Sequence, residues 1–353
     1  MAFTYHCSVI LSNCPVTQKG TKFMSITHGT TARSSAAEPV SPETPEKEPV
    51  TTTARKPKGQ TAPISIFLNG EYIDSREKAM VPLFEHGLLY GDGVFEGIRA
   101  YNGRIFRMRD HMDRLYHSAR GIMLEIPYPK EELGEILLET VRRTGLDDAY
   151  IRLIVSRGPG DLGIDPRKCP KAAVYIIASG IALYPKEKYT KGLRCTIAST
   201  RRNRPDCLNP QIKTLNYLNN IMAKIEAIQS GVDEAIMLND AGCVAEGAAD
   251  NIWVVQGGVL CTPPTHVGIL EGITRLVLME ICDENKMPWR EKNMVVHDLI
   301  KADEIFLCGT GAELIPVVEI DGRVIGTGRP GPVFSKMLEL FRERTRTDGV
   351  PIR

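Results

Sequence analysis

Short apolar runs separated by Asn-Gly pairs mark the part of the chain where a folded pattern begins. The run at 64–68 is followed by Asn69-Gly70 and by a second run at 71–73. Asn-Gly accommodates the positive φ of a tight turn between two strands, so we predict a β-hairpin here. The same pattern recurs over 94–108, with Asn102-Gly103 between the two runs, and predicts a second hairpin.

Apolar residues at intervals of three and four predict amphipathic helices further along the chain. We expect one helix over about 110–123 and another that Pro129 opens and that ends before Gly145. A third helix is expected over about 216–230, closed by Gly231. Its apolar positions form one stripe, which consists of Leu218, Ile221, Met222, Ile225 and Ile228.

Segments rich in apolar and β-branched residues predict strands along the rest of the chain. The strands are expected at 149–156, 173–179, 193–199, 234–238, 251–256, 304–308 and 314–320, and further helices at about 273–284 and 333–345. Because strands and helices are mixed without regular βαβ alternation, we expect an α+β fold of two domains. We place an N-terminal domain at 64–184, a connection at 185–192 and a C-terminal domain at 193–353.

The composition is that of an ordinary globular protein, and it narrows the function. The 353 residues are 42% hydrophobic and 25% charged, with a formal net charge of +1. This charge provides no field that would attract nucleic acid, so an enzyme of small molecules is favoured over a polyanion binder. No apolar run reaches the length that crosses a membrane, so we expect a soluble protein with no membrane partner.

The N-terminal region differs from the rest of the chain. Residues 1–37 contain eleven Ser or Thr, three Lys or Arg and no acidic residue, which is typical of a transit peptide but also of a merely disordered tail. Residues 38–63 contain four Glu and six Pro and are expected to form a linker. A transit peptide would place the protein in a plastid or mitochondrion, and otherwise we expect it in the cytoplasm.

Three glycine-rich clusters remain as candidates for a site after common motifs are excluded. The nine cysteines are scattered without a C-x-x-C pair, so we expect neither a disulfide framework nor a metal site. The usual nucleotide-binding, metalloprotease and serine-hydrolase motifs are also absent from the sequence. The clusters lie at 86–97, 245–251 and 309–313. Glycine allows backbone N–H groups to approach an anion or a flat ring closely.

Lys213 lies between a polar loop and an amphipathic helix. Its neighbours Ile212 and Leu215 are apolar, and an apolar setting allows a lysine amine to be neutral near pH 7. A neutral amine is what a Schiff-base lysine requires. The residues alone permit this role but favour an ordinary lysine.

Several motifs in a fixed order distinguish the chain much further. They are HGLLYGDGVFEGIRAY at 86–101, YIR at 150–152, IKTLNYLNN at 212–220, VAEGAADNIW at 244–253, TPP at 262–264, LEGITR at 270–275 and GTGAE at 309–313. From residue 64 to about 340 the chain resembles the branched-chain aminotransferases of pyridoxal-phosphate (PLP) fold type IV, especially archaeal and bacterial forms. The resemblance implies a smaller N-terminal α/β domain, a larger C-terminal pseudo-barrel domain and a cofactor at their interface.

The resemblance also implies which residues bind the cofactor. Lys213 would form the Schiff base with PLP and then move the proton from the substrate Cα. Glu246 would face the pyridine nitrogen, and Tyr217 the ring hydroxyl. The phosphate would be bound by Arg114, Ile273, Thr274 and Thr310, where a helix N-terminus favours an anion. Taken singly, each could be a surface charge, a helix cap or a half-buried aromatic.

The substrate residues implied by the resemblance must accept both an apolar side chain and the second carboxylate of glutamate. Thr310-Gly311 and Tyr150 would bind the α-carboxylate. Arg152 and Tyr90 would bind the γ-carboxylate, for which the planar guanidinium of arginine is well suited. Phe95 and Tyr184 would line the side-chain pocket. Tyr90 would reach the site of a neighbouring subunit, which implies a homodimer or a higher homo-oligomer.

The implied reaction is transfer of the amino group of L-leucine, L-isoleucine or L-valine to 2-oxoglutarate by a ping-pong mechanism. Alternatives on the same fold are a D-amino acid aminotransferase and an aminodeoxychorismate lyase, and a third is a non-catalytic PLP-fold scaffold. The segments YIR and GVFEGIRAY favour the first reaction. Ala249 replaces a glycine that is usual in the family, and Gly311 stands where many bacterial members have alanine.

Overall fold

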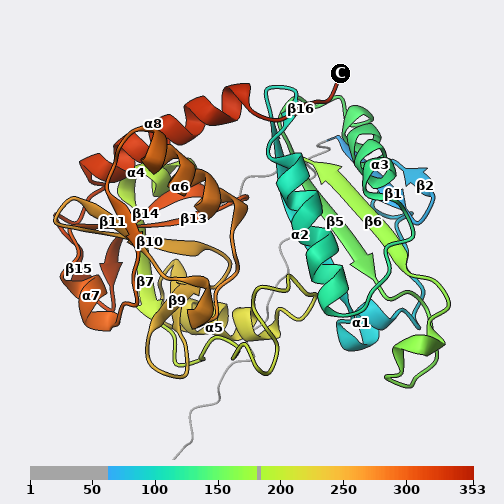
Figure 1. Cartoon of the computed structure of the whole chain (residues 1–353), viewed down its shortest axis with the longest axis horizontal. Coiled ribbons are helices and arrows are strands. Elements are labelled where there is room, and N and C mark those ends of the chain that lie inside the picture. Colours follow the sequence, from blue (N-terminus) through green and yellow to red (C-terminus); the bar gives the residue numbers. More distant parts are fainter. Residues whose placement is uncertain (1–62, 181–183) are drawn as a thin grey trace, which may run out of the picture. The chain divides into compact units, whose positions relative to one another are not determined.

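The computed structural model describes residues 63–180 and 184–353. The tail and possible transit peptide expected over residues 1–62 therefore lie outside the described residues. All described residues belong to one compact unit. Within that unit the strands form two separate sheets, each accompanied by helices (Figure 1).

The first sheet contains seven strands in the order β16-β4-β3-β5-β6-β1-β2, and all neighbours are antiparallel. The strands are β1 (Ile64–Leu68), β2 (Glu71–Ile73), β3 (Gly93–Tyr101), β4 (Arg104–Ile105), β5 (Ala149–Ser156), β6 (Ala173–Ser179) and β16 (Val350–Pro351). Both expected hairpins are confirmed. Leu68 pairs with Glu71 around Asn69-Gly70, and Tyr101 pairs with Arg104.

The second sheet contains nine strands, eight of them in the order β12-β11-β10-β13-β14-β7-β8-β9, with β15 paired to β14. The strands are β7 (Leu193–Ile197), β8 (Glu234–Leu238), β9 (Val244–Gly247), β10 (Asn251–Gln256), β11 (Val259–Thr262), β12 (Trp289–Glu291), β13 (Glu304–Gly309), β14 (Glu313–Ile320) and β15 (Arg323–Val324). Parallel and antiparallel pairs are mixed, because β7 runs parallel to both β14 and β8. The α+β class is confirmed.

Eight α-helices accompany the two sheets in the described residues. They are α1 (His86–Tyr90), α2 (Met108–Gly121), α3 (Lys130–Arg142), α4 (Lys186–Lys191), α5 (Leu218–Gln229), α6 (Ile273–Glu284), α7 (Val296–Ile300) and α8 (Pro332–Thr347). Short 3-10 turns lie at Pro166–Lys168 and Thr265–Val267. None of these described helices is both long and apolar enough to cross a membrane.

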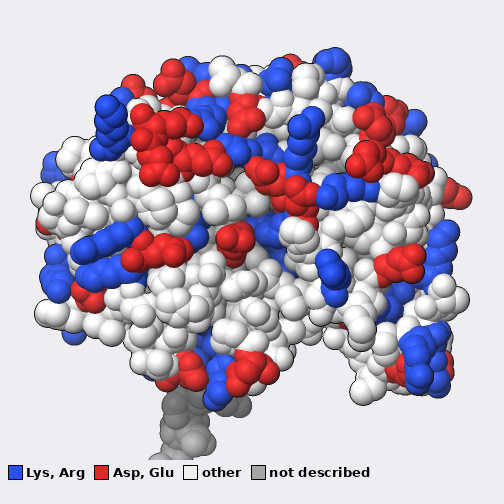
Figure 2. All heavy atoms as spheres, in the orientation of Figure 1, with Lys and Arg blue, Asp and Glu red and all other residues white. Residues whose placement is uncertain are grey.

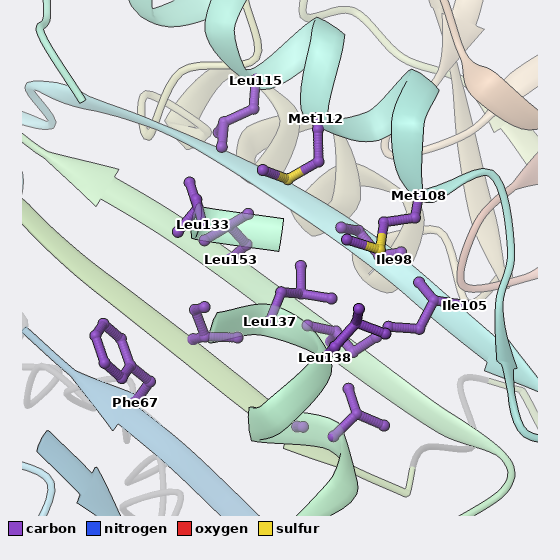
Figure 3. Close-up of a cluster of buried hydrophobic side chains, with 14 of the residues drawn as sticks. Phe67, Ile98, Ile105, Met108, Met112, Leu115, Leu133, Leu137, Leu138 and Leu153 are labelled. Carbon is purple, nitrogen blue, oxygen red and sulfur yellow. The ribbon is translucent and has the colours of Figure 1, made fainter. Parts of the chain in front are cut away.

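The core of the first sheet forms where α2 and α3 cover the apolar side chains of β3 and β5 (Figure 3). Met112 and Leu115 of α2 and Leu137 of α3 are buried there against Leu153 of β5. The helix expected over 110–123 begins and ends two residues earlier. The cause lies at its N-cap, where Arg107 adopts a left-handed φ of 50°, so the hairpin ends and the helix starts there.

The apolar stripe expected on α5 does not face the core. Leu218 is 68% exposed and Ile228 66%, and the other three members of the stripe are exposed as well. The face of α5 that is buried instead carries Asn220, Ala223 and Ala227. Small alanine side chains let the helix approach the sheet closely, so its larger apolar residues remain on the outside. Figure 2 shows few charged side chains on the surface where α5 lies in Figure 1.

The end of the chain returns to the first sheet. Val350 of β16 pairs with Ile105 of β4, although residue 350 falls in the range expected for the C-terminal domain. The loop that carries Lys213 also bonds to the first sheet, because Phe95 N donates to Lys213 O at 3.0 Å. The two sheets are therefore tied by more than one chain crossing. The domain division at 184–193 stays a prediction.

Candidate active site

A cavity of about 650 Å³ lies between β3, β5 and α2 on one side and the loops at the edge of the second sheet on the other. Of the thirteen site residues expected from the sequence, twelve line it or contribute to its wall. They are Phe95, Arg114, Tyr150, Arg152, Tyr184, Lys213, Tyr217, Glu246, Ile273, Thr274, Thr310 and Gly311. These residues are far apart in the sequence, so the fold has brought them to one place.

Lys213 is fixed at the backbone while its amine stays in the cavity. Its N–H donates to Ser118 Oγ at 3.1 Å, and the neighbouring Thr214 bridges to Val94 of β3. The Nζ donates to the Tyr217 hydroxyl at 3.0 Å and lies 4.6 Å from the centre of the Phe95 ring. The amine therefore has a hydroxyl and an aromatic face as neighbours, and we find no ion pair to it from the described residues.

A second lysine, Lys224 of α5, also lines the cavity but is bound quite differently. Its Nζ donates to Asp233 O at 2.6 Å and to Glu234 Oε2 at 2.7 Å. The Lys224 amine is thus occupied by a carbonyl and a carboxylate, whereas the only hydrogen-bond partner of the Lys213 amine among the described residues is the Tyr217 hydroxyl. Of the two lysines, Lys213 is therefore the one that is free to react.

Glu246, at the end of β9, is buried at the cavity wall. Its Oε1 accepts a hydrogen bond from Arg202 Nε at 2.8 Å, and its Oε2 accepts from Asn251 Nδ2 at 3.1 Å and from Leu270 N at 3.0 Å. The side chains of Arg202 and Glu246 are only 7% and 6% exposed. This buried ion pair fixes the carboxylate at the wall of the cavity. Arg202 lies in an irregular polar loop outside the motifs, and nothing in the sequence indicated it.

Arg114 of α2 is held by a buried carboxylate that the sequence did not single out. Its Nε and Nη2 donate to Glu96 Oε1 and Oε2 at 2.8 and 2.7 Å, and His111 Nδ1 lies 2.8 Å from Glu96 Oε2. Burial alone would raise the pKa of Glu96, but the charge of Arg114 and the hydrogen bonds from Arg114 and His111 lower it to about 2. Burial lowers the pKa of His111. The guanidinium is thus fixed in orientation at the cavity wall.

The end of the cavity beside Arg114 is suited to an anion. Arg114 Nη1 donates to Glu271 O at 2.7 Å, which joins α2 to the segment just before α6. Helix α6 follows with Gly272 as its N-cap, so Ile273 and Thr274 are in its first turn and line the cavity. Backbone N–H groups of a first helical turn lack partners within the helix and favour an anion. A guanidinium and a helix N-terminus therefore meet here.

The wall formed by β3 and β5 carries Tyr150 and Arg152, which are two residues apart and point to one face of the strand. Arg152 Nη2 donates to the Tyr150 hydroxyl at 3.1 Å, and its guanidinium lies 4.5 Å from the centre of the Phe95 ring. Burial raises the pKa of Tyr150. A Cβ on Gly97 would collide with the Tyr150 hydroxyl oxygen, so glycine at this position makes room for the tyrosine.

The turn at Thr310-Gly311, between β13 and β14, lies across the cavity from that wall. Arg99 of β3 holds it, because Nη1 donates to Gly311 O at 3.3 Å and pairs with Glu313 Oε1 at 3.1 Å. Glu313 has a φ of 59°, a conformation that is rare for a residue with a side chain. The ion pair thus fixes an unusual turn at the cavity. Arg99 and Glu313 belong to motifs but were not expected at the site.

Tyr90 is the one expected site residue that does not line this cavity. It lies on α1, is 38% exposed, and its hydroxyl donates to Leu162 O at 2.5 Å. The segments around Tyr90 and Leu162 pack together, since Gly160 N donates to Phe84 O at 3.1 Å. The expectation that Tyr90 serves the site of a neighbouring subunit stays a prediction.

No group of three or more His, Cys, Asp or Glu side chains suited to a metal ion occurs in residues 63–180 and 184–353. The seven cysteines in these ranges are all free.

Comparisons with known proteins agree on one family. The family model described as "Amino-transferase class IV" matches residues 93–320. A "Putative branched-chain-amino-acid aminotransferase" of Methanocaldococcus jannaschii is 48% identical over 289 residues, which cover 82% of this chain and 99% of that protein.

Solved structures give the same result. The branched-chain aminotransferase from Thermoproteus uzoniensis with norvaline is 42% identical, with a TM-score of 0.75, over 80% of this chain and 94% of that one. The branched-chain amino acid aminotransferase from Thermobaculum terrenum in its PLP form is 29% identical, with a TM-score of 0.75, over 83% of this chain and 100% of that one. The expected fold type is thereby confirmed, and the chain belongs to the class IV aminotransferase family.

Proposed function

We propose that this chain is a PLP-dependent branched-chain-amino-acid aminotransferase, which moves the amino group of L-leucine, L-isoleucine or L-valine to 2-oxoglutarate. The observation that carries the proposal is the free amine of Lys213, which lies in one cavity with the Arg202-Glu246 pair and the anion site at Arg114. The relatives named as branched-chain aminotransferases support the same substrate class.

The residues of the cavity fit PLP. The anion site of Arg114, Ile273 and Thr274 suits a phosphate, and the Glu246 carboxylate suits a protonated ring nitrogen. The Tyr217 hydroxyl, next to the Lys213 amine, suits a ring hydroxyl. When bound, PLP supplies an electron sink for the bonds at the substrate Cα. The relative solved in its PLP form supports this assignment.

Lys213 would carry the cofactor and later move a proton. The amine can move because Tyr217 and Phe95 are its neighbours and no described carboxylate forms an ion pair with it. Glu246 would face the ring nitrogen and accept its proton in a hydrogen bond, because Arg202, Asn251 and a backbone amide hold the carboxylate in place.

The substrate would bind between the β5 wall and the turn at residues 310–311. We assign the α-carboxylate to the backbone amides of Thr310 and Gly311 with the hydroxyl of Tyr150. Phe95 would contact an apolar side chain, and Arg152 would bind the second carboxylate of glutamate. Arg152 is bonded to a neutral hydroxyl rather than to a carboxylate, so its charge remains available for a substrate.

We propose that the chain assembles as a homodimer or a higher homo-oligomer. Two apolar surfaces support this: the outer face of α5, and the surface formed by Leu88 of α1 with Leu162 and Ile164 of a loop, which are 59%, 70% and 82% exposed. Exposed apolar surface of this kind marks a contact site. Tyr90, which is 38% exposed, borders the second surface, so we assign its ring to the contact with a partner, while its hydroxyl stays bonded to Leu162 O of its own chain.

The proposed transit peptide rests on the composition of residues 1–37 alone, since these residues are outside the described structure. Mass spectrometry of the mature protein purified from its source cell tests it. Removal of an N-terminal segment before residue 64 would support import into a plastid or mitochondrion, and an intact N-terminus would contradict it.

The substrate assignment is tested by a paired assay with 2-oxoglutarate as the acceptor. We expect glutamate formation with L-leucine, L-isoleucine and L-valine and little with D-alanine. Turnover of D-alanine without turnover of L-leucine would instead identify a D-amino acid aminotransferase. Release of pyruvate from aminodeoxychorismate, without transamination, would identify the lyase.

A further inference from the structure

Most charged side chains that line the cavity are already neutralised by a neighbour. Glu246 is paired with Arg202, Arg114 with Glu96, and Lys224 with Glu234. Three charges are left after these pairs: the amine of Lys213, the guanidinium of Arg152 and the carboxylate of Asp250. The first two have roles in the proposed function, and Asp250 has none.

Asp250 lies in the turn between β9 and β10 and lines the cavity. Its backbone is fixed, because Gly247 N donates to Asp250 O at 2.7 Å. Its carboxylate lies against the end of β13, since a Cβ on Gly309 would collide with Asp250 Oδ1. Gly309 immediately precedes the Thr310-Gly311 turn. The carboxylate is thus placed beside the part of the cavity assigned to the substrate.

No described residue donates a hydrogen bond to the Asp250 side chain, and its surroundings are acidic on balance. Glu234 of β8 and Glu246 of β9 act against its ionisation, and Lys224 of α5 and Lys213 act in its favour. Tyr184, Tyr189, Cys195 and Cys308 are the other titratable neighbours. A desolvated acceptor without a partner favours any ligand that brings a donor.

We propose that Asp250 determines the charge selectivity of the substrate pocket. It favours amino acids whose side chain carries a hydrogen-bond donor, such as an ammonium or hydroxyl group, and it disfavours those with a second carboxylate. The inference rests on the proposed aminotransferase function and adds a substrate class to it. Asp250 and Arg152 then have opposite effects on a substrate with a second carboxylate, because Arg152 attracts that group and Asp250 disfavours it.

The chemistry of the two charges explains why one pocket can serve both half-reactions. Burial, followed by the charge of Glu234, raises the pKa of Asp250 to about 7. Near neutral pH a large share of the molecules therefore carries a neutral Asp250, which tolerates apolar and acidic side chains. The ionised share binds a cationic side chain through a charge-assisted hydrogen bond, which is stronger than a neutral one.

The test compares L-norvaline, L-ornithine and L-glutamate as amino donors. L-Ornithine is L-norvaline with a terminal amine, so the ratio of their kcat/KM values isolates the effect of the side-chain charge, and the α-carboxylate common to all three cancels. In Asp250→Asn we expect the ornithine-to-norvaline ratio to fall about tenfold and the glutamate-to-norvaline ratio to rise. Asp250→Glu, which keeps the charge, should preserve the sign of both preferences.

Asp240→Asn is the matched control, because Asp240 is an exposed carboxylate that pairs with Arg204 and does not line the cavity. Ratios in Asp250→Asn equal to those of the wild type and of Asp240→Asn would overturn the inference. A thermal-shift titration with the same three amino acids reads the selectivity without turnover. If the wild type transaminates none of them, the aminotransferase proposal itself fails, while the order of binding still tests Asp250.

Discussion

Glu96 and Arg114 form a buried bidentate ion pair, with hydrogen bonds of 2.8 and 2.7 Å between β3 and α2. The Glu96 side chain is fully buried and that of Arg114 is 12% exposed. Removal of one partner from a buried pair leaves a charge without compensation, which costs about 3 to 5 kcal/mol. The pair therefore serves the stability of the fold as well as the anion site of the cavity.

We expect Glu96→Gln to destabilise the protein by about 3 kcal/mol and to weaken PLP binding, because Arg114 loses its fixed orientation. Equilibrium unfolding and the dissociation constant for PLP measure the two effects. Glu125→Gln is the control, because Glu125 is an exposed glutamate in the segment between α2 and α3. Unchanged cofactor affinity in Glu96→Gln would show that Glu96 does not position Arg114.

The Glu96–Arg114 pair also predicts how the stability of the fold changes at low pH. The folded-state pKa of Glu96 is about 2, below its ordinary value of 4.5. The stabilisation is therefore complete above about pH 4.5 and is lost as the pH falls toward 2. Unfolding measured between about pH 5 and pH 2.5 should show a smaller loss of stability for Glu96→Gln than for the wild type. An identical slope would contradict the assignment.

Arg202 offers a test of the carboxylate that it holds. We expect Arg202→Met to lower kcat by about tenfold or more, because Glu246 loses the buried partner that orients its carboxylate. Arg202→Lys should restore part of the rate, since it returns the charge without the geometry of the guanidinium. Arg201→Met is the neighbouring control, and the Arg201 side chain donates to Ala198 O. If Arg202→Met and Arg201→Met had equal kcat values, Arg202 would have no role at the site.

The outer face of α5 tests the proposed assembly. A charge placed in an apolar interface is costly, so Ile228→Asp, at a stripe position that is 66% exposed and does not line the cavity, should shift the protein toward monomers. Size-exclusion chromatography with light scattering measures the mass in solution. Val324→Asp is the control, because Val324 is 63% exposed on β15, away from α5. Equal masses for both variants and the wild type would mean that this face is not the interface.

Asp250 also predicts a dependence of stability on pH. Its folded-state pKa of about 7 lies above the ordinary 3.8, so the folded state holds a proton that the unfolded chain releases. The stability that the folded protein gains from the proton on Asp250 is therefore fully present below about pH 3.8 and is lost as the pH rises through 7. Asp250→Asn should exceed the wild type in Tm by about 2 °C or more at about pH 8, and by less at about pH 5. A difference independent of pH would contradict this.

The sequence predicted the elements wherever one local pattern decided the structure. Asn69-Gly70 fixed a hairpin, and the Ile and Val run of β5 fixed a strand, because turn geometry and alternation act over a few residues. The sequence placed the apolar residues of α5 on one face but did not indicate where that face lies. Helical spacing shows that Ile221 and Ile225 share a face, but it does not say whether that face meets the core or another surface.

The residues of the candidate site also fall into two groups, those that the sequence indicated and those that only the fold reveals. Lys213 and Glu246 lie in motifs, and their resemblance to a family made them expected. Arg202 lies outside every motif, and only the fold brings it to Glu246. Asp250 lies within a motif. Its proposed role depends on the fact that no described residue donates a hydrogen bond to its carboxylate, which only the folded structure reveals.

The identity of the reacting lysine is the central claim, and two lysines line the cavity. Borohydride reduction of the PLP-loaded protein fixes the cofactor to the amine that carries it, and peptide mass mapping then locates that amine. We expect the added mass on Lys213, with none on Lys224, whose amine is held by Glu234. Added mass on Lys224, or on neither lysine, would contradict the account.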